Sequence, residues 1–349
     1  MSLELSVDGE RWRTHLRAVA ERTPGLVPVL KGNGYGFGLH RLARRAGWLG
    51  ASTVAVGLYE ELPEVAPRFP GDLLVLTPWR PFHEDPADPA LAKRVVHTVS
   101  RPEDLPALLE RRPGARFVLE LATSMRRHGM TAAELWALAP DLRRLGGRLE
   151  GVALHLPLAH GGHLAEVERL LTDVVAADLP SRTVWVSHLT DAERDRLRAA
   201  YADLELRPRT GTDLWLGDRG ALRVTSTVLD VHPLRRGDPY GYRGRTAPRD
   251  GHLLVVSGGT AHGIGLEAPQ GQLGLKDRAR SVAKGGLDAA GLSRSPFWVD
   301  GKQRWFAEPP HMQASMLLLP QGAGVPEVGD RLDARVRYTA TAFDRVVVS

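Results

Sequence analysis

The feature that most constrains the fold is a regular alternation of short apolar runs with amphipathic segments over the first 217 residues. The apolar runs occupy residues 26–31, 53–58, 72–77, 94–99, 116–121, 151–156 and 183–189, and 203–217 contains a further run with its loop. Between several of them, as in 39–49, 132–145 and 164–177, apolar residues recur every three or four positions, the pattern of amphipathic helices. Strands that alternate with helices pair in parallel through right-handed crossovers. Eight such units predict an α/β fold with a (β/α)8 TIM barrel.

An open doubly wound sheet has the same order of strands and helices and remains the alternative. That fold commonly carries a G-x-G-x-x-G turn after its first strand, which this sequence lacks after residue 31. Later in the chain, Gly and Pro clusters separate β-like segments at 221–234, 251–258, 295–307, 314–320 and 331–343. We therefore expect residues 8–218 to form the barrel, and residues 219–349 with 1–7 to form a mostly β domain.

Composition and charge exclude several classes of function. The net charge is only +5 and basic residues form no long run, so we expect no nucleic-acid partner. The absence of cysteine excludes a disulfide scaffold, a zinc ribbon, an iron–sulfur cluster and a thiol nucleophile. The N-terminus lacks the apolar core of a signal peptide, and no apolar stretch is long enough to span a membrane. We expect a cytoplasmic protein.

The most informative stretch is 26–38, LVPVLKGNGYGFG, in which an apolar strand ends at Lys31 and is followed by four glycines and Tyr35. In a barrel, the carboxyl ends of the strands form the active-site face. A lysine held against apolar walls has a lowered pKa and can act as an amine nucleophile that forms a Schiff base. Glycines let backbone N–H groups approach an anion, and Tyr35 adds a hydroxyl donor. These residues together suit pyridoxal phosphate, although a solvent-facing lysine with a flexible loop fits the pattern equally well.

This stretch resembles the cofactor-lysine motif of alanine racemases, because Lys31, Asn33, Tyr35, Gly36 and Gly38 stand at the spacing of that family. The resemblance implies a pyridoxal-phosphate enzyme of fold-type III, with an N-terminal barrel and a C-terminal β domain. It also implies a small amino acid as substrate, and a homodimer in which the β domain of one subunit completes the active site of the other.

Further segments of the barrel resemble the family more weakly. Residues 123–129 place Arg127 where relatives contact the cofactor and the substrate carboxylate, and a forked guanidinium suits a carboxylate. Many relatives carry a carbamylated lysine at the position of Glu120, whose carboxylate would serve Arg127 without modification. His155 stands where a family histidine lies over the cofactor ring. From the residues alone, a surface arginine, a structural ion pair and a core histidine remain the alternatives.

The last barrel segments supply the remaining cofactor contacts that the resemblance implies. Arg209 would meet the pyridine nitrogen, with Arg207 as a competing candidate, and Gly211 and Thr212 would be among the phosphate donors. Thr190 stands near the place of a phosphate-binding serine of the family. An arginine at the pyridine nitrogen would discourage protonation of the ring and so limit side reactions such as transamination.

In the second domain, residues 234–241 resemble the motif that carries the catalytic tyrosine, and Tyr240 is the candidate. Tyr242, two residues away, is expected to face the other side. Met312 matches the family and is expected near the substrate, but Gln313 replaces an acidic residue. The segment 259–263 likewise departs from a G-Y-A-D-G stretch. Both departures fall on segments that shape the substrate pocket in relatives.

We therefore expect a pyridoxal-phosphate amino-acid racemase, most simply one that interconverts L- and D-alanine. Lys31 and Tyr240 of the partner subunit would move protons on opposite faces of Cα. A racemase for another amino acid, an amino-acid decarboxylase or aldolase of the same fold, and an inactive cofactor-binding homologue remain open. A metal-dependent aldolase would carry an H-x-D pair, which 311–313 lacks. We expect no metal at His160 and His163, because no carboxylate converges on them.

Overall fold

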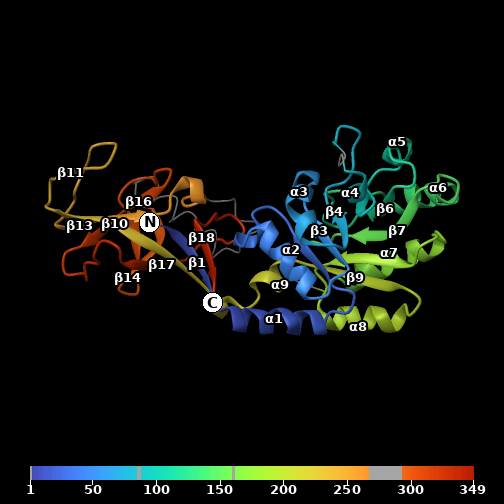
Figure 1. Cartoon of the computed structure of the whole chain (residues 1–349), viewed down its shortest axis with the longest axis horizontal. Helices are drawn as coiled ribbons and strands as arrows, with labels where there is room; N and C mark the ends of the chain where they lie inside the picture. The colour runs from blue at the N-terminus through green and yellow to red at the C-terminus, as the bar shows by residue number, and fades with distance from the viewer. Residues whose placement is uncertain (1, 85–87, 159–161, 267–292) are drawn as a thin grey trace. The chain divides into compact units, whose positions relative to one another are not determined.

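The computed structural model describes residues 2–84, 88–158, 162–266 and 293–349. The chain divides into two compact units, Arg13–Gly217, and Met1–Trp12 joined with Asp218–Ser349. Figure 1 shows both units and labels many of their helices and strands.

The first unit is built on a closed barrel of parallel strands that follow one another in sequence order. The strands are β2 (Val27–Leu30), β3 (Thr53–Val56), β4 (Asp72–Val75), β5 (Val95–Val99), β6 (Arg116–Leu121), β7 (Arg148–Leu154), β8 (Thr183–Ser187) and β9 (Glu205–Thr210). β9 closes the barrel on β2, with Val27 opposite Arg209. The predicted barrel is confirmed. The run 203–217 divides into β9 and a short helix, α9 (Thr212–Leu216), that begins after Gly211.

Helices follow the strands and surround the barrel (Figure 1). They are α1 (Gly9–Glu21), α2 (Leu39–Trp48), α3 (Leu62–Val65), α4 (Pro89–Ala92), α5 (Asp104–Arg111), α6 (Ala132–Leu142), α7 (Leu164–Ala176), α8 (Asp191–Ala200) and α9, and the short 3-10 turns include η1 (Gly34–Gly36) and η2 (Tyr59–Glu61). A capping box begins α6 at Thr131 and Glu134, and another begins α8 at Thr190 and Glu193. Such caps stabilise a helix by about 1 kcal/mol because they satisfy unpaired N–H groups. Among the described residues, no helix has the length and apolar character to cross a membrane.

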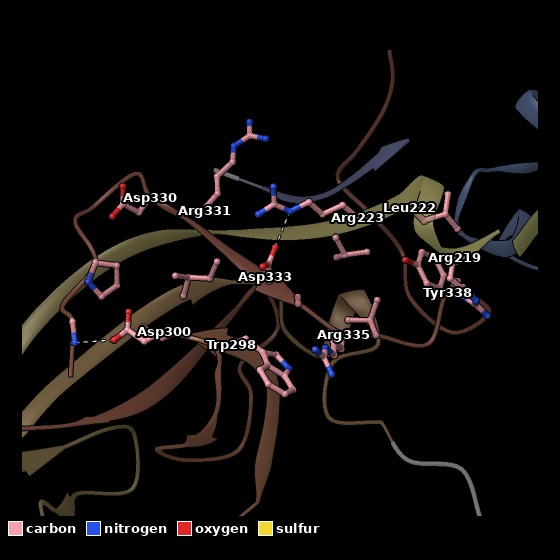
Figure 2. Close-up of a pocket in the computed structure, with 18 of the residues that line it drawn as sticks. Arg219, Leu222, Arg223, Trp298, Asp300, Asp330, Arg331, Asp333, Arg335 and Tyr338 are labelled. Carbon is pink, nitrogen blue, oxygen red and sulfur yellow. Dashed lines mark hydrogen bonds and ion pairs between the residues drawn. The ribbon is translucent and has the colours of Figure 1, made fainter. Parts of the chain in front are cut away.

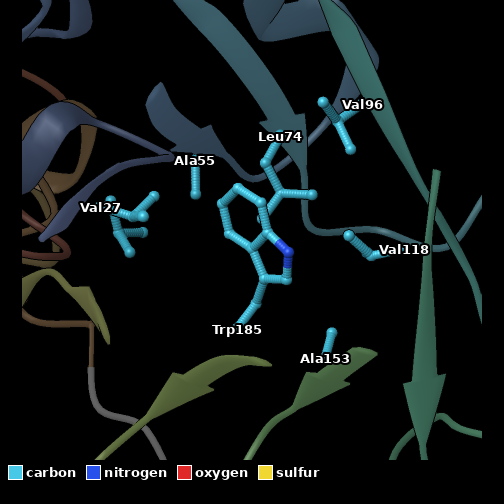
Figure 3. Packing of buried hydrophobic residues seen from close by; sticks show 8 residues of the cluster. Val27, Ala55, Leu74, Val96, Val118, Ala153 and Trp185 are labelled. Atoms are coloured by element: carbon cyan, nitrogen blue, oxygen red, sulfur yellow. The ribbon is translucent and has the colours of Figure 1, made fainter. Parts of the chain in front are cut away.

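A layer of apolar side chains fills the barrel (Figure 3). Its members are Val27, Val29, Ala55, Leu74, Val96, Val118, Ala153 and Trp185. Toward the start of the strands, Arg116 donates to both oxygens of Asp72 at 2.6 Å and to Glu150 at 2.8 Å. Side chains alternate between the two faces of a strand, so residues two positions beyond this apolar layer also face the interior. Those positions lie at the carboxyl ends of the strands.

The second unit contains an eight-stranded, mostly antiparallel sheet with neighbour order β13-β16-β15-β14-β17-β10-β1-β18. Its strands are β1 (Leu3–Val7), β10 (Leu222–Leu234), β13 (Gly251–Ser257), β14 (Arg294–Val299), β15 (Lys302–Phe306), β16 (Ala314–Pro320), β17 (Arg331–Ala334) and β18 (Arg345–Val348), and β11 (Pro239–Tyr240) pairs separately with β12 (Arg245–Thr246). Because β10 also pairs with β13, the strands from β13 to β10 close into a ring. The predicted mostly β domain is confirmed, although the run 331–343 is strand only as far as Ala334.

A groove of about 990 Å³ lies on this β unit, between residues of β10, β14, β17 and the adjoining loops (Figure 2). Within it, the Arg335 guanidinium lies 3.8 Å over the ring of Trp298. Arg223 Nε donates to Asp333 Oδ1 at 2.8 Å. None of the site residues expected from the sequence lines this groove.

Candidate active site

The candidate active site is the set of interior side chains nearest the carboxyl ends of the barrel strands. Alternation along each strand points every second side chain into the barrel. Beyond the apolar layer, several of these inward positions carry polar or charged side chains. We call Lys31, Glu120, His155, Ser187 and Arg209 the mouth layer. In parallel barrels this end of the sheet carries the active site.

Lys31 directly follows β2 and is open to solvent at the barrel mouth. The surrounding wall nevertheless removes part of its hydration, and this desolvation lowers the pKa of the Lys31 ammonium. The positive charges of Arg127 and Arg209 lower this pKa further, whereas Glu61 opposes them. The deprotonated amine, which is the form that acts as nucleophile or base, is therefore more accessible than in a free lysine.

Arg209 is buried in the barrel and retains unused donor capacity. Its Nη2 donates to the carbonyl oxygen of Leu154 at 2.8 Å, whereas its buried Nε has no hydrogen-bond partner among the described residues. Burial lowers the pKa of Arg209 to about 10, and Glu120 counteracts part of this effect. A buried N–H without an acceptor is costly, and an acceptor on a bound molecule would relieve that cost.

Arg207, the competing candidate, lies toward the other end of the barrel. Its guanidinium lies 4.7 Å over the ring of Trp185 and donates to the side-chain oxygens of Ser52 and Thr53 at 3.2 and 3.1 Å. Thr53 is the first residue of β3, so this contact marks the start of the strands. Of the two arginines, only Arg209 lies in the mouth layer.

Glu120 is 4 % exposed and faces the arginines of the mouth. Burial raises the pKa of the Glu120 carboxyl, although Arg209, Arg127 and Arg80 oppose the change. Its Oε2 has no hydrogen-bond partner among the described residues. Arg127 stands in the exposed turn after β6 and acts on Glu120 and Lys31 through its charge. The predicted relation of Glu120 to Arg127 is thus electrostatic in this structure.

Two histidines lie together in the mouth. The ring centroids of His155 and His188 are 5.5 Å apart, and the Ser187 hydroxyl lies 2.9 Å from His155 Nδ1. Desolvation, with the nearby positive charge of Arg209, lowers the pKa of His155 to about 3 and that of His188 to about 4. Both rings are therefore neutral at pH 7. Of the pair considered as metal ligands, His160 lies outside the described residues.

The glycine-rich turn after Lys31 folds against the start of α9. Gly34 has φ +60° and Tyr35 has φ 55°, the left-handed region that L-residues rarely adopt. A Cβ on Gly211 would lie 2.0 Å from Tyr35 Oη, so only glycine lets this hydroxyl approach the backbone. Gly211 directly precedes Thr212, the first residue of α9. The fold thus brings together Tyr35, Gly211 and Thr212.

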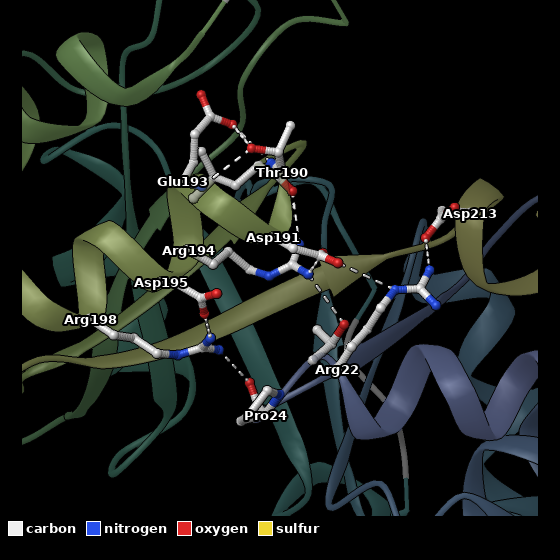
Figure 4. Close-up of polar contacts among 11 residues, drawn as sticks. Arg22, Pro24, Thr190, Asp191, Glu193, Arg194, Asp195, Arg198 and Asp213 are labelled. Carbon is white, nitrogen blue, oxygen red and sulfur yellow. Dashed lines mark hydrogen bonds and ion pairs between the residues drawn. The ribbon is translucent and has the colours of Figure 1, made fainter.

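Thr190 belongs to a polar network that fastens α8 to the segment before β2 (Figure 4). Its hydroxyl donates to Glu193 Oε2 at 2.8 Å and accepts from the Glu193 N–H at 3.3 Å. Arg194 donates to the carbonyl of Leu189 at 2.8 Å and to the hydroxyl of Thr23 at 3.4 Å. The Thr190 hydroxyl is therefore engaged in capping, and its contact with a cofactor stays a prediction.

In the β unit, the two candidate tyrosines differ in exposure. Tyr240 is half-buried and its hydroxyl donates to the carbonyl of Ala307 at 3.3 Å. The side chain of Tyr242 is 91 % exposed, and its ring lies edge-on to His311 at 5.4 Å. Residues two apart on a strand share a face, so the strand does not separate them. The separation comes from Gly241, whose φ of 73° turns the chain between them.

A buried carboxylate holds this turn in place. Glu308 accepts hydrogen bonds from the Tyr242 N–H at 3.0 Å and lies 2.7 Å from His311 Nε2. Burial alone would raise the pKa of Glu308, but these hydrogen bonds outweigh it and leave the pKa below its usual range. Met312, next to His311, is 73 % exposed. The backbone N–H groups of Thr260 and Ala261 donate to the carbonyl oxygens of His311 and Met312 at 2.8 and 2.9 Å, so the two segments that depart from the family, 259–263 and 311–313, lie together.

Sequence reasoning did not single out Glu61 or His188. Both follow a barrel strand within five residues, Glu61 after β3 and His188 after β8. A systematic examination of the residues that follow each predicted strand would have found them, because those residues gather at one end of the barrel.

Comparison with known proteins agrees with this geometry. The family profile described as "Alanine racemase, N-terminal domain" matches residues 7–210. An alanine racemase of Nitratidesulfovibrio vulgaris is 28% identical over 274 residues, which cover 71% of this chain and 72% of that protein. The solved structure of an alanine racemase from Bartonella henselae with covalently bound pyridoxal phosphate superposes with a TM-score of 0.72 at 18% identity and covers 100% of both chains. A histidine racemase from Leuconostoc mesenteroides has a TM-score of 0.69 at 18% identity and covers 100% of this chain and 98% of its own. The chain belongs to the alanine racemase family.

Proposed function

We propose that the chain is a pyridoxal-phosphate-dependent amino-acid racemase that acts most simply on alanine. The observation that carries the proposal is one barrel mouth that holds a lysine with a lowered pKa and a buried arginine whose Nε has no hydrogen-bond partner in the part of the chain that the structure describes. Membership of the family, and a structural neighbour with covalently bound pyridoxal phosphate, support the same cofactor.

The residues of the mouth fit this cofactor. Lys31 would hold it through Nζ, and Arg209 Nε, which finds no acceptor among residues 2–84, 88–158, 162–266 and 293–349, would face the pyridine nitrogen. The remaining contacts would come from His155 beside the ring and from Tyr35, Gly211 and Thr212 around the phosphate, with Thr190 as a more distant candidate. When bound, the cofactor supplies an electron sink for negative charge at Cα.

The protein groups bind the substrate and move its protons. The exposed guanidinium of Arg127 would bind the substrate carboxylate. Lys31 Nζ, as the amine, would take the Cα proton from one face, and a tyrosine hydroxyl would deliver a proton to the opposite face. The reverse reaction exchanges the two roles. Because His155 is neutral, it adds no positive charge beside the ring.

The tyrosine would come from the β domain of a second subunit in a homodimer. Tyr240 is the candidate from the sequence, but its hydroxyl is engaged with Ala307. The exposure of Tyr242 makes it the stronger candidate for entry into another subunit's barrel. Either tyrosine would need cationic neighbours to act near neutral pH, since its ordinary pKa is about 10.

A racemase for another amino acid is the second candidate. One structural neighbour is named a histidine racemase, and Gln313 stands where relatives carry an acidic residue. The substrate is therefore best identified by incubating the protein with each common L-amino acid and pyridoxal phosphate, with chiral chromatography and carbon dioxide measured together. A D-product without carbon dioxide supports a racemase. Carbon dioxide release indicates a decarboxylase, and bound cofactor without any product indicates an inactive homologue.

We expect Lys31→Ala to abolish the visible absorbance of the bound cofactor and the formation of D-product, because the motif 26–38 contains no second lysine that could hold the cofactor. The measurement is the absorbance spectrum of the purified variant after gel filtration. Lys93→Ala, which alters a lysine outside the mouth, serves as the control and should keep the spectrum. A Lys31→Ala protein with the wild-type spectrum would contradict the proposal.

A further inference from the structure

Glu61 joins the ends of two neighbouring barrel strands. Its Oε1 accepts the backbone N–H of Gly32 at 2.6 Å, and its Oε2 accepts those of Gly57 at 2.6 Å and Leu58 at 3.2 Å. Gly32 directly follows Lys31, whereas Gly57 and Leu58 directly follow β3. One carboxylate therefore fixes the end of β2, where Lys31 stands, to the end of β3.

Gly57 lies next to both the Lys31 side chain and the Glu61 carboxylate. A Cβ on Gly57 would lie 3.0 Å from Lys31 Cβ and 3.1 Å from Glu61 Oε2. Such distances are tighter than most real Cβ contacts, so a side chain at position 57 would require the Lys31 stem or the Glu61 carboxylate to move by a few tenths of an ångström. The stem of Lys31 and the carboxylate of Glu61 consequently share one small space at the barrel mouth.

Glu61 is also the acidic group whose charge acts on Lys31. Arg127 and Arg209 favour the neutral amine, and Glu61 favours the ammonium. The titratable side chains that share this end of the barrel with Lys31 are Tyr35, Glu61, Glu120, Arg127, His155, His188 and Arg209. Of the two carboxylates in that group, only Glu61 affects the titration of Lys31 noticeably.

We infer that Glu61 is a positioning residue for Lys31: its carboxylate ties the strand end that carries Lys31 to the end of β3 and keeps a negative charge beside the stem of the lysine. The inference rests on the proposed role of Lys31 and assigns a function to a residue outside the cofactor motif. Both parts depend on one carboxylate, because the three N–H bonds keep its charge beside the lysine.

The test measures the reactivity of the Lys31 amine as a function of pH. The chain is freed of cofactor by dialysis against hydroxylamine, which releases a lysine-bound aldehyde as its oxime, and then against buffer. It is labelled with acetic anhydride, and the peptide that contains Lys31 is quantified by mass spectrometry against those of Lys93 and Lys302. We expect Glu61→Gln to lower the midpoint of labelling, because the charge that favours the ammonium is lost. Glu60→Gln changes an exposed neighbour and should keep the wild-type midpoint. An unchanged or raised midpoint in Glu61→Gln overturns the inference.

A second variant distinguishes the effect of the negative charge of Glu61 from the effect of its hydrogen bonds to both strand ends. Glu61→Asp keeps the charge but is too short to bond both strand ends, so we expect a midpoint close to that of the wild type and a several-fold loss of affinity for pyridoxal phosphate. An Asp variant whose midpoint falls as far as that of the Gln variant overturns the role of charge, and wild-type cofactor affinity overturns the role in positioning. Labelling requires neither cofactor nor substrate, so its result is independent of whether the chain proves to be a racemase.

Discussion

Burial and the positive charge of nearby arginines shift the pKa of several side chains in the barrel mouth. Arg209 loses most of its hydration and keeps a donor without a partner among the described residues. His155 stays neutral because desolvation and Arg209 disfavour its protonated form. A neutral ring can lie against an aromatic cofactor, and Arg209 and Arg127 are the cations that the proposal above assigns to ligand binding.

The lowered pKa of His155 predicts a pH-dependent stability. The unfolded chain binds a proton at this histidine below a pH of about 6.5, whereas the folded chain does so only near a pKa of about 3. The unfolded state therefore holds more protons between these values, and stability is lost as the pH falls through this window. We expect His155→Gln to lose about 1 kcal/mol less than the wild type between pH 7 and pH 5, after allowance for partial exposure.

Denaturant unfolding of the cofactor-free protein at the two pH values measures this difference. His40→Gln, at an exposed histidine, should show the same loss as the wild type. Equal losses in His155→Gln and the wild type would exclude His155 as the source of the pH dependence.

The sequence indicates single site residues well where chemistry and position coincide in one motif. Lys31 follows a strand and precedes a glycine-rich turn, so both its place and its chemistry are visible locally. The choice between Arg207 and Arg209 could not be made in this way, because both side chains point from β9 into the barrel. Only the closed barrel shows that Arg207 lies toward the start of the strands and Arg209 toward their carboxyl ends. Glu61 escaped notice because its partners are backbone groups after two different strands.

At the scale of elements, apolar runs predict the barrel strands because such strands are buried on both faces. The runs 116–121 and 314–320 coincide with β6 and β16. The run 331–343 is also β-like in sequence, yet only Arg331–Ala334 forms a strand, which pairs with β10 and β14. Alternation within a segment does not reveal whether a neighbouring strand is available along its whole length.

The contact between η1 and α9 gives a prediction at this scale. In Gly211→Ala the new methyl group would meet Tyr35 Oη at 2.0 Å and Cζ at 2.9 Å. We expect a loss of about 1–3 kcal/mol in the free energy of unfolding, as for other overpacked sites, with weaker binding of pyridoxal phosphate. Denaturant unfolding and a fluorescence titration with the cofactor measure the two effects.

Two further variants make this test specific. Tyr35→Phe combined with Gly211→Ala removes the nearest atom and should recover part of the lost stability. Gly47→Ala, in α2, has its nearest neighbour at 4.0 Å and should retain full stability and cofactor affinity. A Gly211→Ala protein as stable as the wild type would show that the turn can move aside without cost.

At the scale of the whole molecule, the proposed site residues fall in two different units. Lys31, Arg209 and His155 belong to the barrel unit, whereas Tyr240, Tyr242 and Met312 belong to the β unit. If one catalytic group comes from each unit, the proton transfers on the two faces of Cα depend on how units assemble. A homodimer with shared sites, as proposed above, makes every active site a product of two chains.

Shared sites predict complementation between two inactive variants. When Lys31→Ala and Tyr242→Phe chains are co-expressed with different tags, half of the dimers are mixed, and each mixed dimer contains one site with both defects and one intact site. We expect about a quarter of the wild-type specific activity from the mixture and almost none from either variant alone. The same experiment with Tyr240→Phe decides between the tyrosines, since only the variant of the acting tyrosine is inactive alone and complements Lys31→Ala. A mixture in which purified mixed dimers stay inactive would assign lysine and tyrosine to the same chain, and the catalytic unit would then be a single subunit.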